Sequence, residues 1–198
     1  MSDFNVNLAG HNLEYLHNEH LYLVDGVVVP SVTSIVKEVL PNAWRWVSPN
    51  VLQQAADKGT AVHEAVEKYI YRGEECDLPE LDGFKQLQKS HQFNVIGCEV
   101  PVIVFWGGEP VAAGRFDLDL DFDGIRCGAD VKRVSQVNKD YVKLQLNFYR
   151  IGVKQCYNVD WQGLKVIQLR ESRRRIIDVP IDENCVYDAL QAFTGKEM

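Results

Sequence analysis

The 198-residue sequence lacks the long hydrophobic run that a membrane-spanning helix requires. A helix that crosses a bilayer needs about 20 consecutive apolar residues, and no stretch of this sequence approaches that length. The first ten residues contain no basic region followed by an apolar one, which is the pattern of a secretory signal. We therefore expect a cytoplasmic location and no membrane partner.

Closely spaced cysteines are also absent. The five cysteines are scattered through the chain, and no two of them form a CxxC pair. Zinc sites and disulfide frameworks both depend on recurring cysteine spacings. The sequence therefore favours free, buried thiols, which behave as small hydrophobic side chains.

Basic residues are scarce outside one segment. The chain carries 21 Lys and Arg against 28 Asp and Glu, a net charge of −7, which argues against a protein that coats DNA indiscriminately. Residues 132–175, however, carry 11 Lys and Arg against 3 Asp and Glu, a local net charge of +8. Such a segment beside acidic ones provides cations for phosphate and carboxylates for metal, although a solvated charged helix and loop would have the same composition.

The pattern of apolar residues predicts a single α/β domain over residues 1–198. We expect a mixed central β-sheet flanked by helices, with a small N-terminal β-ribbon before it. Residues 1–40 are assigned to this ribbon and a first helix, 48–180 to the core, and 181–198 to a closing helix. Strands are predicted at 13–16, 21–29, 98–105, 111–121, 125–134, 164–170 and 176–179, and helices at 31–40, 49–71, 80–93, 138–153 and 182–193. The predicted N-caps include Ser31, Ser48 and Asp182.

Two aspartates and a lysine are the strongest candidates for chemistry. Asp117 and Asp130 lie on consecutive predicted strands that a hairpin joins, so both carboxylates can reach one end of the sheet. Lys132 follows Asp130 by two residues and therefore lies on the same face of its strand. Hydrolysis of a phosphodiester uses such a set, because carboxylates hold Mg²⁺ or Mn²⁺ and a lysine can orient the water or stabilise the transition state.

The same pattern is compatible with an exposed hairpin that carries charged outer positions. Small or apolar residues surround Asp117 and Asp130, however, as expected for acids that point into a cleft. The neighbouring Asp119, Asp121 and Asp123 lack that setting, and we expect them to be solvated charges near the strand end.

A histidine and a helical pair extend the candidate set. His63 lies on a predicted helix and shares a face with Glu67, one turn later. A single helical histidine is more often a structural residue than a metal ligand. Gln145 and Tyr149, at positions i and i+4, could equally be a polar pair on a helix that packs against the sheet.

The order of these motifs resembles that of the PD-(D/E)XK nucleases. A helical GTxxHxxxE at 59–67, Glu99, a GRxD at 114–117, a DxK at 130–132 and a QxxxY at 145–149 follow one another along the chain. Over about residues 30–155 the sequence is similar to the RecB-like and phage exonuclease branch. The segment 30–33 and the tryptophans Trp44 and Trp46 also look like phage members of that branch.

The resemblance implies a restriction-endonuclease-like core and a site for Mg²⁺ or Mn²⁺. By this resemblance Asp117, Asp130 and His63 bind the metal, Glu99 supports the metal or the water, and Lys132 is the catalytic lysine.

Further residues are implied at the edge of that site. Gln145 and Tyr149 match the helix pair that lies near the site and the DNA. Arg133, where many relatives have Thr or Ser, Lys143 and Trp44 are candidates for contacts with DNA. The clustered C-terminal cysteines that hold an iron–sulfur cluster in some relatives are missing, and we predict no such cluster.

The expected function is therefore a metal-dependent DNA nuclease. The phage-like N-terminal half favours an exonuclease in recombination, repair or DNA end processing, with a single-strand-annealing or other recombination protein as a partner and with homo-oligomers allowed. The alternatives are a structure-specific endonuclease and a nuclease-like module that binds DNA or protein without cleavage. RNA ranks lower as a substrate because the sequence contains no aromatic RNA-binding signature.

Overall fold

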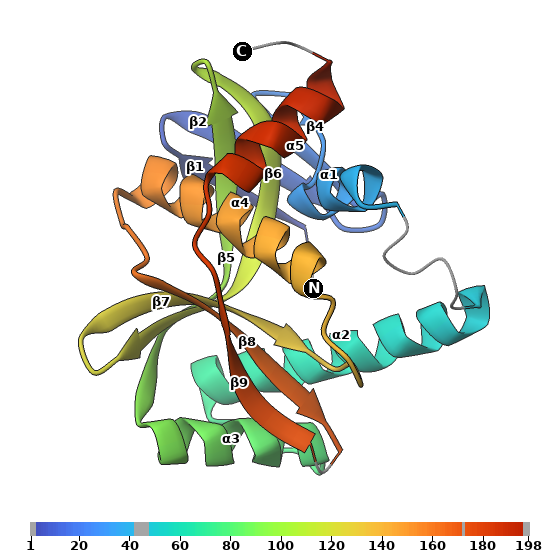
Figure 1. Cartoon of the computed structure of the whole chain (residues 1–198), viewed down its shortest axis with the longest axis vertical. Helices are drawn as coiled ribbons and strands as arrows, with labels where there is room; N and C mark the ends of the chain where they lie inside the picture. Colours follow the sequence, from blue (N-terminus) through green and yellow to red (C-terminus); the bar gives the residue numbers. More distant parts are fainter. Residues whose placement is uncertain (1–2, 42–47, 172, 196–198) are drawn as a thin grey trace.

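The computed structural model, which describes residues 3–41, 48–171 and 173–195, contains two β-sheets and five helices within those ranges (Figure 1). The N-terminal sheet is a consecutive antiparallel meander. Its strands are β1 Phe4–Leu8, β2 His11–Leu16, β3 Leu21–Val24 and β4 Val27–Val29. The predicted ribbon is thus a four-stranded sheet, and its first strand was missed because exposed polar residues interrupt a short apolar pattern.

The central sheet has five strands in chain order, and all neighbours are antiparallel except β7 and β8. Its strands are β5 Phe93–Trp106, β6 Glu109–Phe122, β7 Ile125–Lys132, β8 Gly163–Arg170 and β9 Arg173–Val179. The parallel pair requires a crossover, which α4 Lys139–Tyr157 provides. The mixed α/β class predicted from the sequence is confirmed.

Helices cover both faces of the central sheet (Figure 1). One core joins the sheet to α4, α1 Val32–Val39 and α5 Asn184–Thr194. A second core joins it to α2 Pro49–Arg72 and α3 Pro79–His91. None of the described helices is long and apolar enough to cross a membrane.

Local signals explain most helix boundaries. The Ser31 side chain accepts the backbone N–H of Ser34 at 3.0 Å and caps α1 as predicted. The prediction for α3 was wrong at its end, since the helix stops at His91 and Phe93 opens β5. At α5 the cap is Glu183 rather than Asp182, although the Asp182 carboxylate accepts the N–H of Asn184.

The strands β6 and β7 separate at one point, and this separation positions the candidate site. β6 pairs with β5 along nearly its whole length, but it pairs with β7 only over Leu118–Phe122. The last pair is Leu118 with Ala129, after which Asp117 and Asp130 follow on the diverging strands. Both aspartates therefore stand where the sheet opens.

Asp119 corrects one expectation. Its side chain is 7% exposed, whereas we expected a solvated charge. The Asp119 carboxylate accepts hydrogen bonds from the guanidinium of Arg126 and, at 3.0 Å, from Nε1 of the fully buried Trp161. The segment before β8 brings Trp161 over this strand pair, a contact between residues 42 positions apart that local sequence does not show.

The indole ring of Trp161 packs directly against Gly128, so we predict that no larger side chain fits at position 128 without a loss of stability. A Cβ atom added to Gly128 would lie 2.1 Å from the indole ring. Gly128→Ala should therefore lower the free energy of unfolding by about 1–3 kcal/mol, the usual cost of overpacking a core. Urea denaturation followed by tryptophan fluorescence measures this change.

Gly59 provides a matched control for this substitution. It lies within α2, and a Cβ atom there would have no neighbour within 4 Å. Gly59→Ala should leave stability unchanged or raise it by up to about 1 kcal/mol, because alanine is the better helix former. Equal stability of the wild type and Gly128→Ala would contradict the packing described here.

Candidate functional site

A cavity of about 510 Å³ opens where β6 and β7 separate. The N-terminal sheet, α1, α2 and α4 all contribute to its wall. The lining includes most of the residues that the sequence singled out: His63, Glu99, Asp117, Asp130, Lys132, Arg133, Gln145 and Tyr149.

Three potential metal ligands converge in this cavity. His63, Glu99 and Asp117 each offer one ligand atom, and these atoms lie within 4.8 Å of one another. Nδ1 of His63 is 3.4 Å from Oε1 of Glu99 and 3.6 Å from Oδ2 of Asp117. The three residues come from α2, β5 and β6, so the site exists only in the folded chain.

The register of β5 and β6 brings the two carboxylates together. Cys98 pairs with Leu118 and Val100 with Phe116, so Glu99 stands opposite Asp117. Like charges directly opposite each other on paired strands repel. Glu99 also has a φ of 51°, a left-handed conformation that costs free energy in a non-glycine residue. A strained residue that adds to a charge cluster is typical of a site selected for binding rather than for stability.

The hydrogen bonds of His63 fix which ring nitrogen faces the carboxylates. Nε2 lies 2.9 Å from the carbonyl oxygen of Val131, and it must donate because a carbonyl only accepts. Nδ1 therefore faces the carboxylates of Glu99 and Asp117, and it holds a proton there while the ring is charged. A metal ion that replaced this proton would bind Nδ1, and a backbone carbonyl behind the ring is usual for metal-binding histidines.

The Asp130–Lys132 pair completes the charged set. The ammonium of Lys132 donates to Oδ1 of Asp130 at 2.6 Å, which confirms that the two side chains share a face. The other oxygen, Oδ2, is buried and accepts no hydrogen bond among the described residues. The same holds for Oε1 of Gln145. Buried oxygens of this kind are costly, and the Asp130 oxygen has the chemistry of a ligand for a hard cation.

Burial and mutual repulsion shift the protonation equilibria of the site. Burial raises the pKa of Asp130 to about 6, and burial together with the nearby Glu99 raises the pKa of Asp117. Burial alone would lower the pKa of His63, but the carboxylates of Asp117 and Glu99 raise it more strongly, to about 9. A cluster of titratable groups whose pKa values are shifted by burial and by one another is common at functional sites.

Asp117 also fixes the backbone of the departing strand. Its Oδ2 accepts the N–H of Val131 at 2.6 Å, while the carbonyl of Val131 accepts from His63. The backbone N–H and the backbone carbonyl of Val131, between Asp130 and Lys132, are therefore both hydrogen-bonded to side chains of the cluster. This arrangement couples the position of Lys132 to the proposed ligands.

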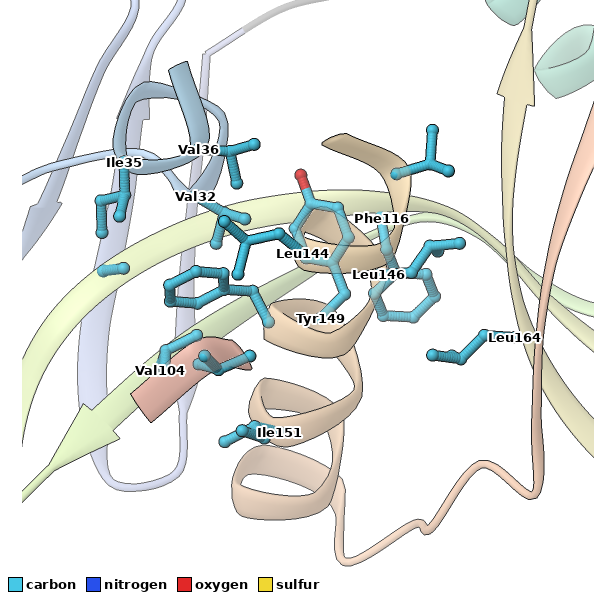
Figure 2. Packing of buried hydrophobic residues seen from close by; sticks show 14 of the residues in the cluster. Val32, Ile35, Val36, Val104, Phe116, Leu144, Leu146, Tyr149, Ile151 and Leu164 are labelled. Atoms are coloured by element: carbon cyan, nitrogen blue, oxygen red, sulfur yellow. The ribbon is translucent and has the colours of Figure 1, made fainter. Parts of the chain in front are cut away.

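Gln145 and Tyr149 of α4 lie in the cavity wall as the motif predicts. Figure 2 shows Tyr149 among Val32, Val36, Phe116 and other core side chains. Gly114 permits this packing, because a Cβ atom there would lie 2.9 Å from the Tyr149 ring. The glycine of the GRxD pattern thus makes room for the aromatic residue of the QxxxY pattern.

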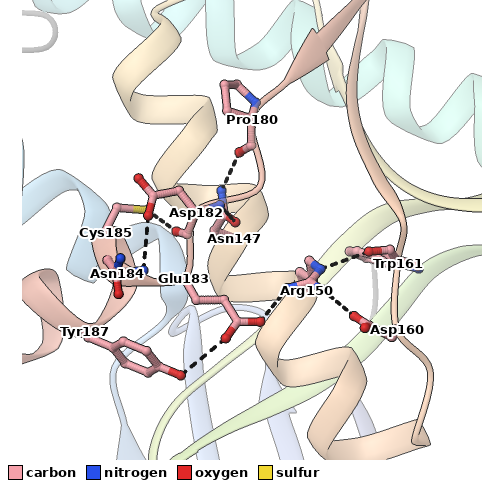
Figure 3. Close-up of polar contacts among 10 residues, drawn as sticks. All are labelled: Asn147, Arg150, Asp160, Trp161, Pro180, Asp182, Glu183, Asn184, Cys185 and Tyr187. Carbon is pink, nitrogen blue, oxygen red and sulfur yellow. Dashed lines mark hydrogen bonds and ion pairs between the residues drawn. The ribbon is translucent and has the colours of Figure 1, made fainter.

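Figure 3 shows the polar contacts that anchor α4. The buried Arg150 donates from Nε to the carbonyl of Trp161 at 2.9 Å and forms ion pairs with Asp160 and Glu183. Nδ2 of Asn147 donates to the carbonyl of Pro180. These contacts hold the helix against the segment that follows it and against the segment that leads to α5.

The remaining candidates have different outcomes. Arg133 lines the cavity while its Nε donates to the buried Glu80 at 2.8 Å. Lys143 pairs with Asp182 at 2.6 Å and is not part of the cavity lining. Trp44 lies outside the described residues.

Arg115 is a site residue that the sequence reasoning missed. Its Nε lies 2.9 Å from Oε2 of Glu99, and its guanidinium lies 5.9 Å from the centroid of the Tyr15 ring. Its position two residues before Asp117 was the available signal, since alternate residues of a strand share a face. Tyr15 and Tyr22 of the N-terminal sheet also line the cavity, and no local pattern connects them with it.

Comparisons with known proteins add little to this geometry. No family model matches the sequence, and no curated protein matches it. A solved structure titled as the crystal structure of SSO0001 is similar to this chain, with a TM-score of 0.44 and 14% identity over 85% of this chain and 77% of that one. A similarity of this size assigns neither a fold family nor a function to this chain.

The ligand cluster predicts a metal-dependent gain in stability. Saturating Mn²⁺ should raise the melting temperature of the wild type, because a ligand at about 100 times its Kd stabilises the folded state by about 2.7 kcal/mol. Asp117→Asn keeps the size of the side chain but removes one ligand charge, and it should abolish most of that shift. Differential scanning calorimetry with Mn²⁺ and with EDTA measures both effects.

Glu64→Gln is the control for this experiment. Glu64 follows His63 on α2, but its carboxylate lies 3.8 Å from the ammonium of Lys68 on the helix surface. The control should respond to Mn²⁺ as the wild type does. A full Mn²⁺ shift in Asp117→Asn would show that the metal binds elsewhere.

Proposed function

We propose that this protein is a divalent-metal-dependent nuclease that hydrolyses phosphodiester bonds in DNA. One observation carries the proposal: the ligand atoms of His63, Glu99 and Asp117 converge in a cavity that also contains the Asp130–Lys132 pair. Hard oxygen ligands beside a lysine are the set that metal-assisted hydrolysis of a phosphodiester requires. The ordered motifs of the PD-(D/E)XK pattern lie together in this cavity, which supports the same function.

The residues present fit a Mg²⁺ or Mn²⁺ ion. Asp117 and Glu99 would supply carboxylate oxygens, His63 would supply Nδ1, and Asp130 would supply the buried Oδ2 that has no hydrogen-bond donor among the described residues. When bound, the ion would polarise the scissile phosphate and lower the pKa of a water molecule.

Asp130, Lys132 and Gln145 have separate roles in this reaction. Asp130 accepts from Lys132 and so directs the ammonium toward the cavity. Burial lowers the pKa of Lys132, but Asp130 and Asp117 raise it more, so the amine stays protonated and can donate to a phosphate oxygen or to the attacking water. The unused oxygen of Gln145 is available as an acceptor for that water or for a nucleotide.

Residues from several elements line the cavity. Tyr15 and Tyr22 come from the N-terminal sheet, Lys37 from α1 and Thr60 from α2. The resemblance of the N-terminal half of the sequence to phage exonucleases favours cleavage from a DNA end. We therefore propose exonuclease activity.

Cleavage assays test the proposed function directly. End-labelled linear DNA and closed circular DNA are incubated with Mg²⁺ or Mn²⁺, and the products are separated on denaturing gels. The wild type should degrade linear DNA only, and EDTA should stop the reaction. Lys132→Ala should lower kcat by about 10²–10³, the usual cost of removing one donor that stabilises the transition state.

Lys68→Ala removes the same charge from the surface of α2 and should retain wild-type activity. Activity that persists in both Asp117→Ala and Lys132→Ala would falsify the assignment of the site. Cleavage of the circular substrate at a similar rate would instead identify an endonuclease.

A further inference from the structure

The register of the central sheet places a row of arginines on the face that carries Lys132. Lys132 pairs with Gln168 of β8, and Gln168 pairs with Arg175 of β9. Directly paired residues project from the same face of a sheet. Arg170 and Arg173, also a cross-strand pair, lie two residues further toward the β8–β9 turn and share that face.

The spacing of this row suits the backbone of a nucleic acid strand. Neighbouring strands are about 4.8 Å apart, so the backbone of Arg175 lies about 10 Å from that of Lys132. Arg170 and Arg173 lie two residues further along their strands, about 7 Å from the level of Gln168 and Arg175. Each nucleotide advances a DNA strand by about 3.4 Å, so the row reaches phosphates about three to four nucleotides from the one beside Lys132.

Hydrogen bonds hold two of these arginines in place without neutralising them. Nη1 of Arg173 donates to the carbonyl of Ser135 at 2.8 Å, and Nε of Arg175 donates to Oε1 of Gln168 at 2.7 Å. Both acceptors are uncharged. Within the described ranges, no ion pair involves Arg170, Arg173 or Arg175.

Most basic residues elsewhere in the described structure behave differently. Arg126, Arg133 and Arg150, for example, each face a carboxylate within 2.8 Å. Arginines that form no ion pair within the chain are available to bind an anion. Because three of them lie on one face near the cavity, we expect an anionic partner from outside the chain.

A second hollow continues this surface. It measures about 480 Å³ and lies between the segment before α4 and strand β9. Lys139 and Arg175 contribute its basic groups. Asp178 is the acidic residue of the lining, and its carboxylate pairs with Lys165 at 2.7 Å. The hollow therefore presents uncompensated positive charge.

We propose that Arg170, Arg173, Arg175 and Lys139, here called the arginine face, bind the phosphate backbone of the DNA strand whose scissile bond lies in the cavity. The inference rests on the proposed nuclease function and adds the path that the strand takes. The strand leaves the cavity past Lys132, passes over the segment after β7 that covers the buried Gln168, and reaches the arginines of the arginine face. Contacts to phosphates carry no base information, so the arginine face increases affinity without sequence preference.

A double substitution tests the arginine face. Arg170→Gln with Arg173→Gln removes two charges, and the glutamine at position 173 keeps an N–H donor for the carbonyl of Ser135. Binding of a fluorescein-labelled DNA duplex is measured by anisotropy at increasing KCl, with Ca²⁺ in place of Mg²⁺ to prevent cleavage. The slope of log K against log salt should become shallower by about 0.9 for each phosphate that the variant no longer neutralises, or about 2 in total.

The matched control is Lys89→Gln with Lys154→Gln. Both lysines are exposed, and they lie in the last turns of α3 and α4. The control should keep the salt dependence of the wild type. Hydrolysis of bis-p-nitrophenyl phosphate with Mn²⁺, a substrate too small to reach the arginine face, should be unchanged in both double variants.

The outcomes separate the two proposals. A salt slope equal to that of the wild type overturns the arginine face while the nuclease function stands. Loss of bis-p-nitrophenyl phosphate hydrolysis in the arginine variant also overturns it, because the arginines would then maintain the catalytic cavity itself. A wild type that neither binds nor cleaves DNA overturns both proposals.

Discussion

The carboxylates of Glu99 and Asp117 meet across the β5–β6 pairing, with Nδ1 of His63 within 3.6 Å of both. This concentration of buried ionisable side chains is the constraint on which the site depends. It is unfavourable by itself, because like charges on paired strands repel and burial raises the pKa of Asp117. The cationic groups of His63 and Arg115 offset part of that repulsion. A metal ion, as proposed above, would stabilise the same carboxylates.

The rest of the architecture keeps these charges in position. β7 departs from β6 after the Leu118–Ala129 pair, and the gap gives solvent and substrate access to the charged groups. α2 brings His63 from one face of the sheet, while α4 brings Gln145 and Tyr149 from the other. The Arg150 contacts fix α4 to the segment that follows it and to the start of α5. Each layer of the fold thus contributes one part of the site.

The local sequence was sufficient to predict the contacts of a residue wherever those contacts come from its own segment. Period-2 alternation placed Asp130 and Lys132 on one face, and their 2.6 Å contact confirms it. Ser31 could be predicted as an N-cap because the bond that it forms is local: its side chain accepts a backbone N–H three residues away. Asp119 was predicted wrongly for the opposite reason. Its burial depends on Trp161, which arrives from a segment 42 residues later, and no local pattern encodes that contact.

The sequence by itself determined the α/β class, the strand positions of Asp117, Asp130 and Lys132, and the helical position of His63, since these follow from the spacing of apolar residues and caps. Only the tertiary structure decided that Glu99 stands opposite Asp117, that Arg115 pairs with Glu99, and that Arg173 and Arg175 share a face with Lys132. Those relations depend on register between strands distant in the chain. A shift of one residue in that register would turn every side chain to the other face.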